Sequence, residues 1–347
     1  MTHEYERIEV PRNGLRLHLN ENTGGCSPRV LAAIGRLGPA DLATYPDYGD
    51  VHTAVARFFG VDESRLLLTN GLDEGILAAA VAWLRGSARD EAIIIEPAFG
   101  MYADAVEAAG GHMVTVLPDD QLGVPLAATV AAVTPRTRLV FFASPVNPSG
   151  VVVPPEVIGG IARALPPEAV LFLDEAYADF ADSHFLGELS HWPNVLVGRT
   201  FAKAYGLAGL RAGAVIGHAG AIARLRRIVP PYSLNAAVAA ILPVALEDQQ
   251  HVAWYRGQVE ISRELIYAAC RRLGLRYWPS QANFVLVHVG DALTRVTAGL
   301  AARRIYVRNR SSQPGCAGCV RITAGVAAHT RACVTALEEI LGHRGEA

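Results

Sequence analysis

Lysine is almost missing from this chain. Among its 347 residues are 31 basic ones, and 30 of these are arginine; Lys203 is the single lysine. Arginine carries the same charge, but its guanidinium stays protonated above about pH 12 and cannot act as an amine nucleophile. A primary amine can condense with an aldehyde to form a Schiff base. Lys203 therefore has two interpretations: a remnant of drift toward arginine codons, or an amine kept for chemistry.

Charge and long apolar runs are scarce too. Only 18% of the residues are charged and the net charge is −2. No basic run interleaved with aromatic residues occurs, so we expect no nucleic-acid partner. No uncharged apolar stretch reaches about 18 residues, and the first 14 residues are polar, so we expect no membrane span and no signal region. A cytoplasmic protein is predicted.

Cysteine is sparse and odd in number. The five cysteines lie in a long chain without secretory features, which favours reduced thiols. Cys316 and Cys319 form a C-x-x-C, but no second pair completes a zinc site. We therefore predict no metal and interpret the pair as two loop cysteines without function.

Apolar residues make up 51% of the chain, and a chain of this length favours two domains. Continuous apolar runs, typical of strands buried on both faces, occupy residues 65–69, 92–96, 112–116, 138–143, 169–174, 194–198 and 212–216. Helical patterns lie between them at 73–84, 100–109 and 155–164. This alternation predicts an α/β domain with a mainly parallel, seven-stranded sheet covered by helices.

The pattern changes after about residue 230. Residues 233–272 predict one long helix or two consecutive ones, followed by a smaller α+β region with strands at 284–288, 305–308 and 319–323. We expect an N-terminal arm at 1–40 that belongs in part to the small domain, a large domain at 41–240 and a small domain at 241–347. Near the N-terminus, Ser27 is expected to cap a helix that begins at Pro28, and Asp50 to cap a helix that runs to Phe59.

Residues that could carry chemistry follow the ends of predicted strands, where open parallel sheets bind ligands. They are Asn147, Asp174 with Tyr177, and Lys203, which Arg211 follows eight residues later. Each has an ordinary alternative: a turn residue for Asn147, a helix cap for Asp174, a packed aromatic for Tyr177, and a surface ion pair for Arg211. The order and spacing of the motifs are more specific than any one residue.

Taken together, the motifs resemble those of pyridoxal phosphate (PLP) enzymes of the aspartate aminotransferase fold (class I/II, fold type I), most closely the histidinol-phosphate aminotransferase group. The resemblance covers nearly the whole chain. It is carried by L-N-E-N at 19–22, Y-P-D at 45–47, N-G-L-D-E at 70–74, E-P-A-F-G-M-Y at 96–102, V-N-P-S-G at 146–150, D-E-A-Y at 174–177, R-T-F-A-K-A-Y-G-L-A-G-L-R at 199–211, P-P-Y-S-L-N at 230–235, Q-A-N-F at 281–284 and V-R-I-T at 320–323.

The resemblance implies roles around the cofactor ring. Lys203 would bond PLP as an aldimine and then move a proton at the substrate's Cα. Asp174 would pair with the pyridine nitrogen. Tyr177 and Asn147 would bond the phenolic oxygen, and Phe99 would stack on the ring face.

It also implies how the cofactor phosphate is held. Amides around Gly71, Leu72 and Asp73 would meet it at the start of a helix, and Arg211 would add a charged bond. Where the family has a phosphate-binding serine this chain has Ala202, and Thr200 could compensate. Tyr45 would reach the phosphate of a neighbouring subunit, which implies a homodimer with shared sites.

For the substrate, the resemblance implies that Arg321 binds the α-carboxylate, with Asn22 or Asn147 nearby. Arg308 matches a position associated with the far end of the substrate. Gly24 stands where the family usually has a tyrosine that lines the pocket, so we expect a more open pocket there.

The implied function is a cytoplasmic, homodimeric aminotransferase of amino-acid biosynthesis. It would exchange an amino group between an L-amino acid, or an amino-phosphate such as histidinol phosphate, and a 2-oxo acid. One alternative keeps PLP but decarboxylates, eliminates, cyclises or oxidises an amino acid in specialised biosynthesis. Another is a regulator that has kept the fold without the activity; the intact Lys203, Asp174 and Arg211 argue against it.

Overall fold

The computed structural model describes residue 11, residues 13–84 and residues 89–342. Its larger sheet has seven strands, and β8 runs antiparallel to both of its neighbours while the others are parallel. Across the sheet the order is β2 (Leu66–Thr69), β8 (Gly213–Ile216), β7 (Val195–Thr200), β6 (Val170–Asp174), β5 (Thr137–Ala143), β3 (Glu91–Ile95) and β4 (His112–Val116). The predicted α/β fold with a mainly parallel seven-stranded sheet is confirmed.

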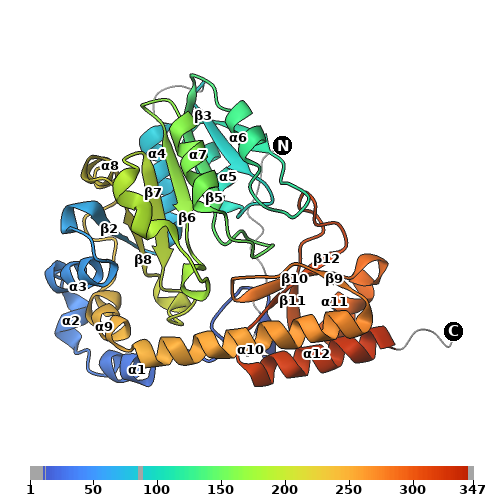
Figure 1. The fold of residues 1–347 in the computed structure, drawn as a ribbon. Helices are drawn as coiled ribbons and strands as arrows, with labels where there is room; N and C mark the ends of the chain where they lie inside the picture. Colours follow the sequence, from blue (N-terminus) through green and yellow to red (C-terminus); the bar gives the residue numbers. More distant parts are fainter. Residues whose placement is uncertain (1–10, 12, 85–88, 343–347) are drawn as a thin grey trace.

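The central strands are apolar throughout because both faces of the sheet are covered. In β5, Val140 and Phe142 belong to one apolar cluster while Leu139 and Phe141 belong to the other, as the two-residue repeat of a strand requires. Helices α4 (Leu72–Trp83), α5 (Met101–Ala108) and α8 (Ala219–Leu225) cover the second cluster, and α7 (Pro155–Ala164) covers the first (Figure 1). Every predicted strand and helix of this region lies within two residues of its observed bounds.

The smaller sheet joins the two ends of the chain. Its five strands lie in the order β1 (Leu15–Leu17), β11 (Ile305–Asn309), β12 (Cys319–Thr323), β10 (Phe284–His288) and β9 (Arg276–Tyr277). Strand β1 pairs in parallel with β11, so that Leu17 lies opposite Val307. Helices α11 (Leu293–Ala302) and α12 (Ala327–Gly342) complete this part.

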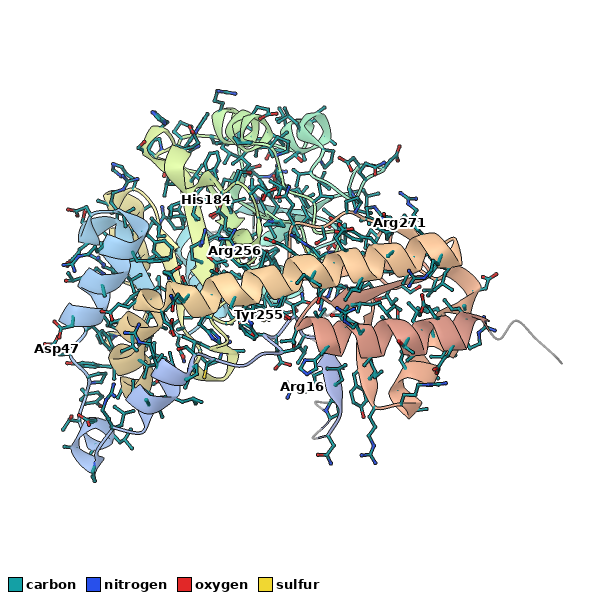
Figure 2. All side chains as sticks on the ribbon, turned by 60° about the horizontal axis from the view of Figure 1, so that its bottom comes forward. Arg16, Asp47, His184, Tyr255, Arg256 and Arg271 are labelled. Carbon is teal, nitrogen blue, oxygen red and sulfur yellow. The ribbon has the colours of Figure 1, made fainter. Side chains whose placement is uncertain are left out.

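Residues 233–272 form two helices rather than one. Helix α9 (Ala236–Glu247) ends where the Asp248 carboxylate accepts the His251 N–H at 3.4 Å and caps α10 (Gln249–Leu273). Helix α10 runs beneath both sheets beside α12 (Figure 1), and Tyr255 marks its course in Figure 2. Among the described residues, no helix is both long and apolar enough to cross a membrane.

The remaining helices lie at the N-terminal side and in the connections. They are α1 (Pro28–Ile34), α2 (Pro39–Ala43), α3 (Gly49–Phe59) and α6 (Leu126–Ala131), with the short 3₁₀ helices η1 (Glu63–Arg65), η2 (Ala178–Phe180), η3 (Phe185–His191), η4 (Ala208–Leu210) and η5 (Gly290–Ala292). Ser27 caps α1 as predicted, accepting the Arg29 N–H at 3.0 Å. The predicted cap at Asp50 is wrong: α3 begins at Gly49, whose N–H is taken by the Asp47 carboxylate at 2.9 Å, and Asp50 lies inside the first turn.

Candidate active site

A cavity of about 590 Å³ lies at the carboxyl ends of the central parallel strands. Ala143, Asp174 and Thr200 line it, and they are the last residues of β5, β6 and β7. Parallel strands bring their carboxyl ends to one edge of the sheet, which is where such sheets bind ligands. The end of β11 and residues 18–21 form the opposite wall, so the cavity lies between the two sheets.

A buried carboxylate lies on the sheet side of this cavity. Asp174 is 5% exposed; its Oδ2 accepts the Tyr102 hydroxyl at 2.6 Å and its Oδ1 accepts the Ala176 N–H at 2.9 Å. Burial, the largest effect, raises the pKa of Asp174 to about 6. The group is therefore mostly ionised at neutral pH and can pair with a protonated ring nitrogen.

The single lysine lies in the same cavity. Lys203 follows β7, and its Nζ donates to the backbone oxygen of Leu19 at 3.0 Å, while lying 6.0 Å from the centre of the Tyr177 ring. The Tyr177 hydroxyl accepts from Nδ2 of Asn20 at 3.0 Å. The segment just after β1 therefore positions both the amine and the phenol.

An anion-binding group lies at the start of α4. Leu72 and Asp73 line the cavity at the helix N-terminus, and Arg211 donates to the Asp73 carboxylate at 2.7 Å. Gly71 precedes them with φ +76°, and a Cβ on it would lie 2.3 Å from Nη2 of Arg211. Helix N–H groups beside a guanidinium favour a phosphate. Thr200 lines the cavity nearby and accepts the Ala202 N–H at 3.2 Å.

A second guanidinium is fixed on the opposite wall. Arg321, on β12, donates to Asn147 Oδ1 and to the His18 backbone oxygen, both at 2.7 Å, and lies over the Phe284 ring. In the register of the small sheet, Arg308 on β11 lies directly opposite Arg321, and both line the cavity. This wall can bind the acidic group of a substrate.

Each of these groups can bind one part of PLP. Lys203 supplies an amine for an aldehyde, Asp174 an ionised carboxylate for a ring nitrogen, and the α4 N-terminus with Arg211 a place for a phosphate. Phe99 lines the cavity and can cover a ring face. Gly71 has no side chain, so the Arg211 guanidinium packs directly against it and lies beside the start of α4. The residues present thus fit the cofactor.

Four of the predicted site residues are not in this cavity. Gly71 lies behind Arg211, and Tyr45 is 77% exposed and stacks on Tyr232 at 4.4 Å. Asn22 donates to the Ala204 backbone oxygen at 2.9 Å and lines an adjacent hollow. Gly24 lies beside Trp254, where a Cβ would come within 2.8 Å of the indole, so the structure does not show the expected opening of the pocket at Gly24.

Sequence reasoning missed several residues that the cavity contains. Tyr102 lies three residues after Phe99 in the E-P-A-F-G-M-Y motif, and Asn20 is inside L-N-E-N, so both were within quoted motifs. Arg310 was not missed: with Arg303, Arg304 and Arg308 it forms a basic cluster in the sequence that could meet an anionic group or be a solvated edge, and it lines the cavity with Arg308. His18 is 3% exposed and gave no local signal.

Comparisons with known proteins agree with this chemistry. The sequence profile of the aminotransferase class I and II family matches residues 12–341. A histidinol-phosphate aminotransferase from Moorella thermoacetica is 32% identical, covering 97% of this chain and 88% of the relative. Histidinol-phosphate aminotransferase 2 from Ralstonia nicotianae is 36% identical, covering 94% and 88%.

Among solved structures, the histidinol-phosphate aminotransferase from Sinorhizobium meliloti in complex with pyridoxal 5′-phosphate is similar over 95% of this chain and 92% of that one. Its TM-score is 0.85 at 29% identity. The family match, the relatives and the chemistry of the cavity converge, and the chain belongs to the class I and II aminotransferase family as a PLP-dependent aminotransferase.

Proposed function

We propose that this aminotransferase exchanges an amino group between an amino-phosphate of the histidinol phosphate kind and a 2-oxo acid. The observation that carries the proposal is one cavity in which Lys203 and Asp174 face Arg308 and Arg321. The curated relatives at 32–36% identity are histidinol-phosphate aminotransferases, which supports this substrate class.

We assign the residues on the sheet side to the cofactor. The α4 N-terminus, Arg211 and Thr200 would hold its phosphate, Phe99 would cover the ring, and Asn147 and Tyr177 would bond the ring oxygen. When bound, PLP supplies an electron-withdrawing ring that acidifies the Cα–H bond of an attached amino substrate.

Two residues then carry the proton chemistry. Asp174, ionised at neutral pH, would pair with the cofactor's ring nitrogen and favour its protonated form. Nζ of Lys203 would hold the cofactor's aldehyde carbon at rest, and as a free amine it would take the proton from the substrate's Cα. Leu19, whose oxygen accepts from this amine at 3.0 Å, holds Nζ on the correct side of the cavity.

A homodimer with shared sites is part of the proposal. Tyr45 and Tyr232 form an exposed aromatic pair outside the cavity, as a residue that reaches into a partner subunit would. The proposed cytoplasmic location is supported by the five cysteines, all of which are free thiols.

The test is a coupled assay of the PLP-loaded protein with histidinol phosphate and 2-oxoglutarate. Glutamate should form, while Lys203→Arg should keep the fold and charge but abolish turnover, because a guanidinium cannot bond the aldehyde. If glutamate forms only with a different amino donor, histidinol phosphate is not the substrate. Release of ammonia or carbon dioxide without glutamate would point to the other PLP reactions instead.

A further inference from the structure

A small apolar cluster, separate from the two larger ones, links the two sheets. Leu122 enters it from the connection between β4 and α6, on the side of the larger sheet. The other buried members come from the smaller sheet and its connections: Trp278, Leu286, Cys316 and Cys319. Leu122 therefore fits as one knob into a socket made by the other sheet, and the C-x-x-C pair supplies two walls of this socket.

The knob touches the connection between β11 and β12 directly. A Cβ on Gly315, in that connection, would lie 2.5 Å from Cδ2 of Leu122, so only a glycine leaves room for the leucine. A second contact lies nearby, where the Arg276 guanidinium donates to the Asp120 backbone oxygen at 3.3 Å. The β4–α6 connection is thus held against the smaller sheet at two points.

The backbone of Leu122 has an unusual conformation. Its φ is +59°, in the left-handed region, which costs free energy for a bulky residue. The Asp119 carboxylate accepts the N–H groups of Gln121 and Gly123 at 2.9 and 2.8 Å, and the Asp119 backbone oxygen accepts that of Leu122 at 3.0 Å. Strained residues persist where their surroundings fix them. The loop therefore presents the leucine to the socket in one defined position.

The socket is coupled to the cavity through the β11–β12 connection. Three successive turns stiffen it: Gln313 donates its N–H to Arg310, Cys316 to Gln313 and Cys319 to Cys316, at 2.9–3.0 Å. Gln313 lines the cavity and its side chain donates to the Ala98 backbone oxygen at 2.8 Å. The two strands that this connection joins carry Arg308 and Arg321, directly opposite each other.

The V-N-P-S-G loop ties the knob to the same arginines from the other side. The buried Ser149 hydroxyl donates to the Leu122 backbone oxygen at 3.0 Å. Two residues earlier, Asn147 Oδ1 accepts from Arg321 at 2.7 Å. Leu122 thus lies between the two segments that determine where Arg321 stands in the cavity.

We propose that Leu122 is a positioning residue that fixes Arg308 and Arg321 at their distance from Lys203. This rests on the proposed function, in which these arginines bind the acidic group of the substrate. If the socket is loosened, the arginines are in place for only part of the time, and the apparent affinity for substrate falls by that fraction. The groups assigned to PLP, such as Asp174 and Arg211, lie on the side of the larger sheet and are unaffected.

Steady-state kinetics and PLP titration test this role with histidinol phosphate and L-glutamate as amino donors. Leu122→Ala should raise KM for both donors about tenfold, because a knob that leaves a cavity no longer holds the socket. At saturation the substrate itself draws the arginines into place, so kcat should stay within about threefold. The Kd for PLP should stay within about twofold. A Kd for PLP that rises as much as KM would overturn the proposal.

Two further variants separate the side chain from the backbone strain. Leu122→Gly removes the knob and also relieves the positive φ, so its KM should match that of Leu122→Ala. Leu122→Met nearly conserves the volume and should keep KM within about threefold of wild type. If Leu122→Gly has the KM of wild type, the leucine side chain does not position the arginines.

Leu225→Ala is the matched control. Leu225 on α8 is fully buried, and its apolar cluster draws its described members from residues 67–225 alone. It is not among the described residues that line the cavity. The control should lose stability through the same loss of buried volume but keep KM and the Kd for PLP within about twofold of wild type.

Hydrogen exchange separates this proposal from the proposed function. In the PLP-loaded protein without substrate, Leu122→Ala should speed amide exchange in residues 311–318 about tenfold and leave α4 unchanged. If histidinol phosphate does not react while KM for L-glutamate responds to Leu122→Ala, the substrate class is wrong and the positioning role stands. If exchange in residues 311–318 is equal in the two proteins, the knob does not hold the connection and the proposal is wrong, whatever the substrate.

Discussion

The hydroxyl of Tyr102 donates to Oδ2 of Asp174 at 2.6 Å, inside a fully buried site. Tyr102 stacks on Phe141 at 5.1 Å, so the phenol is held by the apolar side of the sheet while its oxygen reaches the carboxylate. The bond favours the ionised form of Asp174 and opposes the effect of burial. A residue outside the predicted site thus keeps the carboxylate charged.

Tyr102→Phe should weaken PLP binding about 3- to 10-fold at pH 7. The ring still packs on Phe141, but Asp174 loses a donor, its pKa rises further and a smaller fraction is ionised. Spectroscopic titration with PLP measures this. The ratio of variant to wild-type Kd should shrink by pH 8.5, where Asp174 is ionised in both proteins. A Kd ratio that does not change with pH would contradict the proposal that Tyr102 keeps Asp174 ionised.

The raised pKa of Asp174 makes the PLP-free protein less stable as pH increases. The folded-state pKa of about 6 lies above the ordinary value of 3.8, so the folded state binds the proton more tightly, and this stability is lost as pH rises from about 4 to 6. The shift corresponds to about 3 kcal/mol. In urea unfolding, the free energy of unfolding of wild type should fall relative to that of Asp174→Asn between about pH 4 and 6. Above that window the difference should stay constant. A difference independent of pH would show that Asp174 is not protonated on folding.

Gly71→Ala should impair PLP binding more than stability. The new Cβ would lie 2.3 Å from Nη2 of Arg211, the mobile end of a long side chain, which can move away and leave the phosphate site. Gly60→Ala is the control, because Gly60 also has positive φ (+66°) but nothing within 4 Å. Both variants should lose about 1 kcal/mol from the backbone conformation. Only Gly71→Ala should weaken PLP binding, by about tenfold; equal PLP affinities would exclude the steric argument.

The sequence predicted the large sheet well for a physical reason. Strands buried on both faces are continuous apolar runs, and their carboxyl ends converge, so Asp174 and Lys203 could be placed in one cavity from local pattern alone. The pairing of β1 with β11 joins residues nearly 300 positions apart, and no local pattern encodes it. That pairing brings His18 into the cavity beside the L-N-E-N motif, and His18 itself could not be predicted from the sequence.

The buried ion pairs beneath the D-E-A-Y motif give the largest expected effect on stability. Arg199, at 7% exposure, donates to Glu175 at 3.0 Å and to Asp179 at 2.7 Å, on either side of Tyr177. Arg199→Met keeps much of the side-chain volume but leaves two carboxylates without their cation. Because buried charges cannot be resolvated, the variant should lose about 3–5 kcal/mol in urea unfolding.

The control for Arg199 is a surface pair of the same chemistry. Arg303 lies 3.4 Å from Glu339 and both side chains are about half exposed, so Arg303→Met should cost less than about 1 kcal/mol. PLP binding adds a second readout: because the pairs fix the segment between Asp174 and Asp179, Arg199→Met should also weaken PLP affinity, whereas Arg303→Met should not. Equal small losses in the two variants would mean that water reaches the Arg199 site and that other contacts hold the D-E-A-Y motif in place.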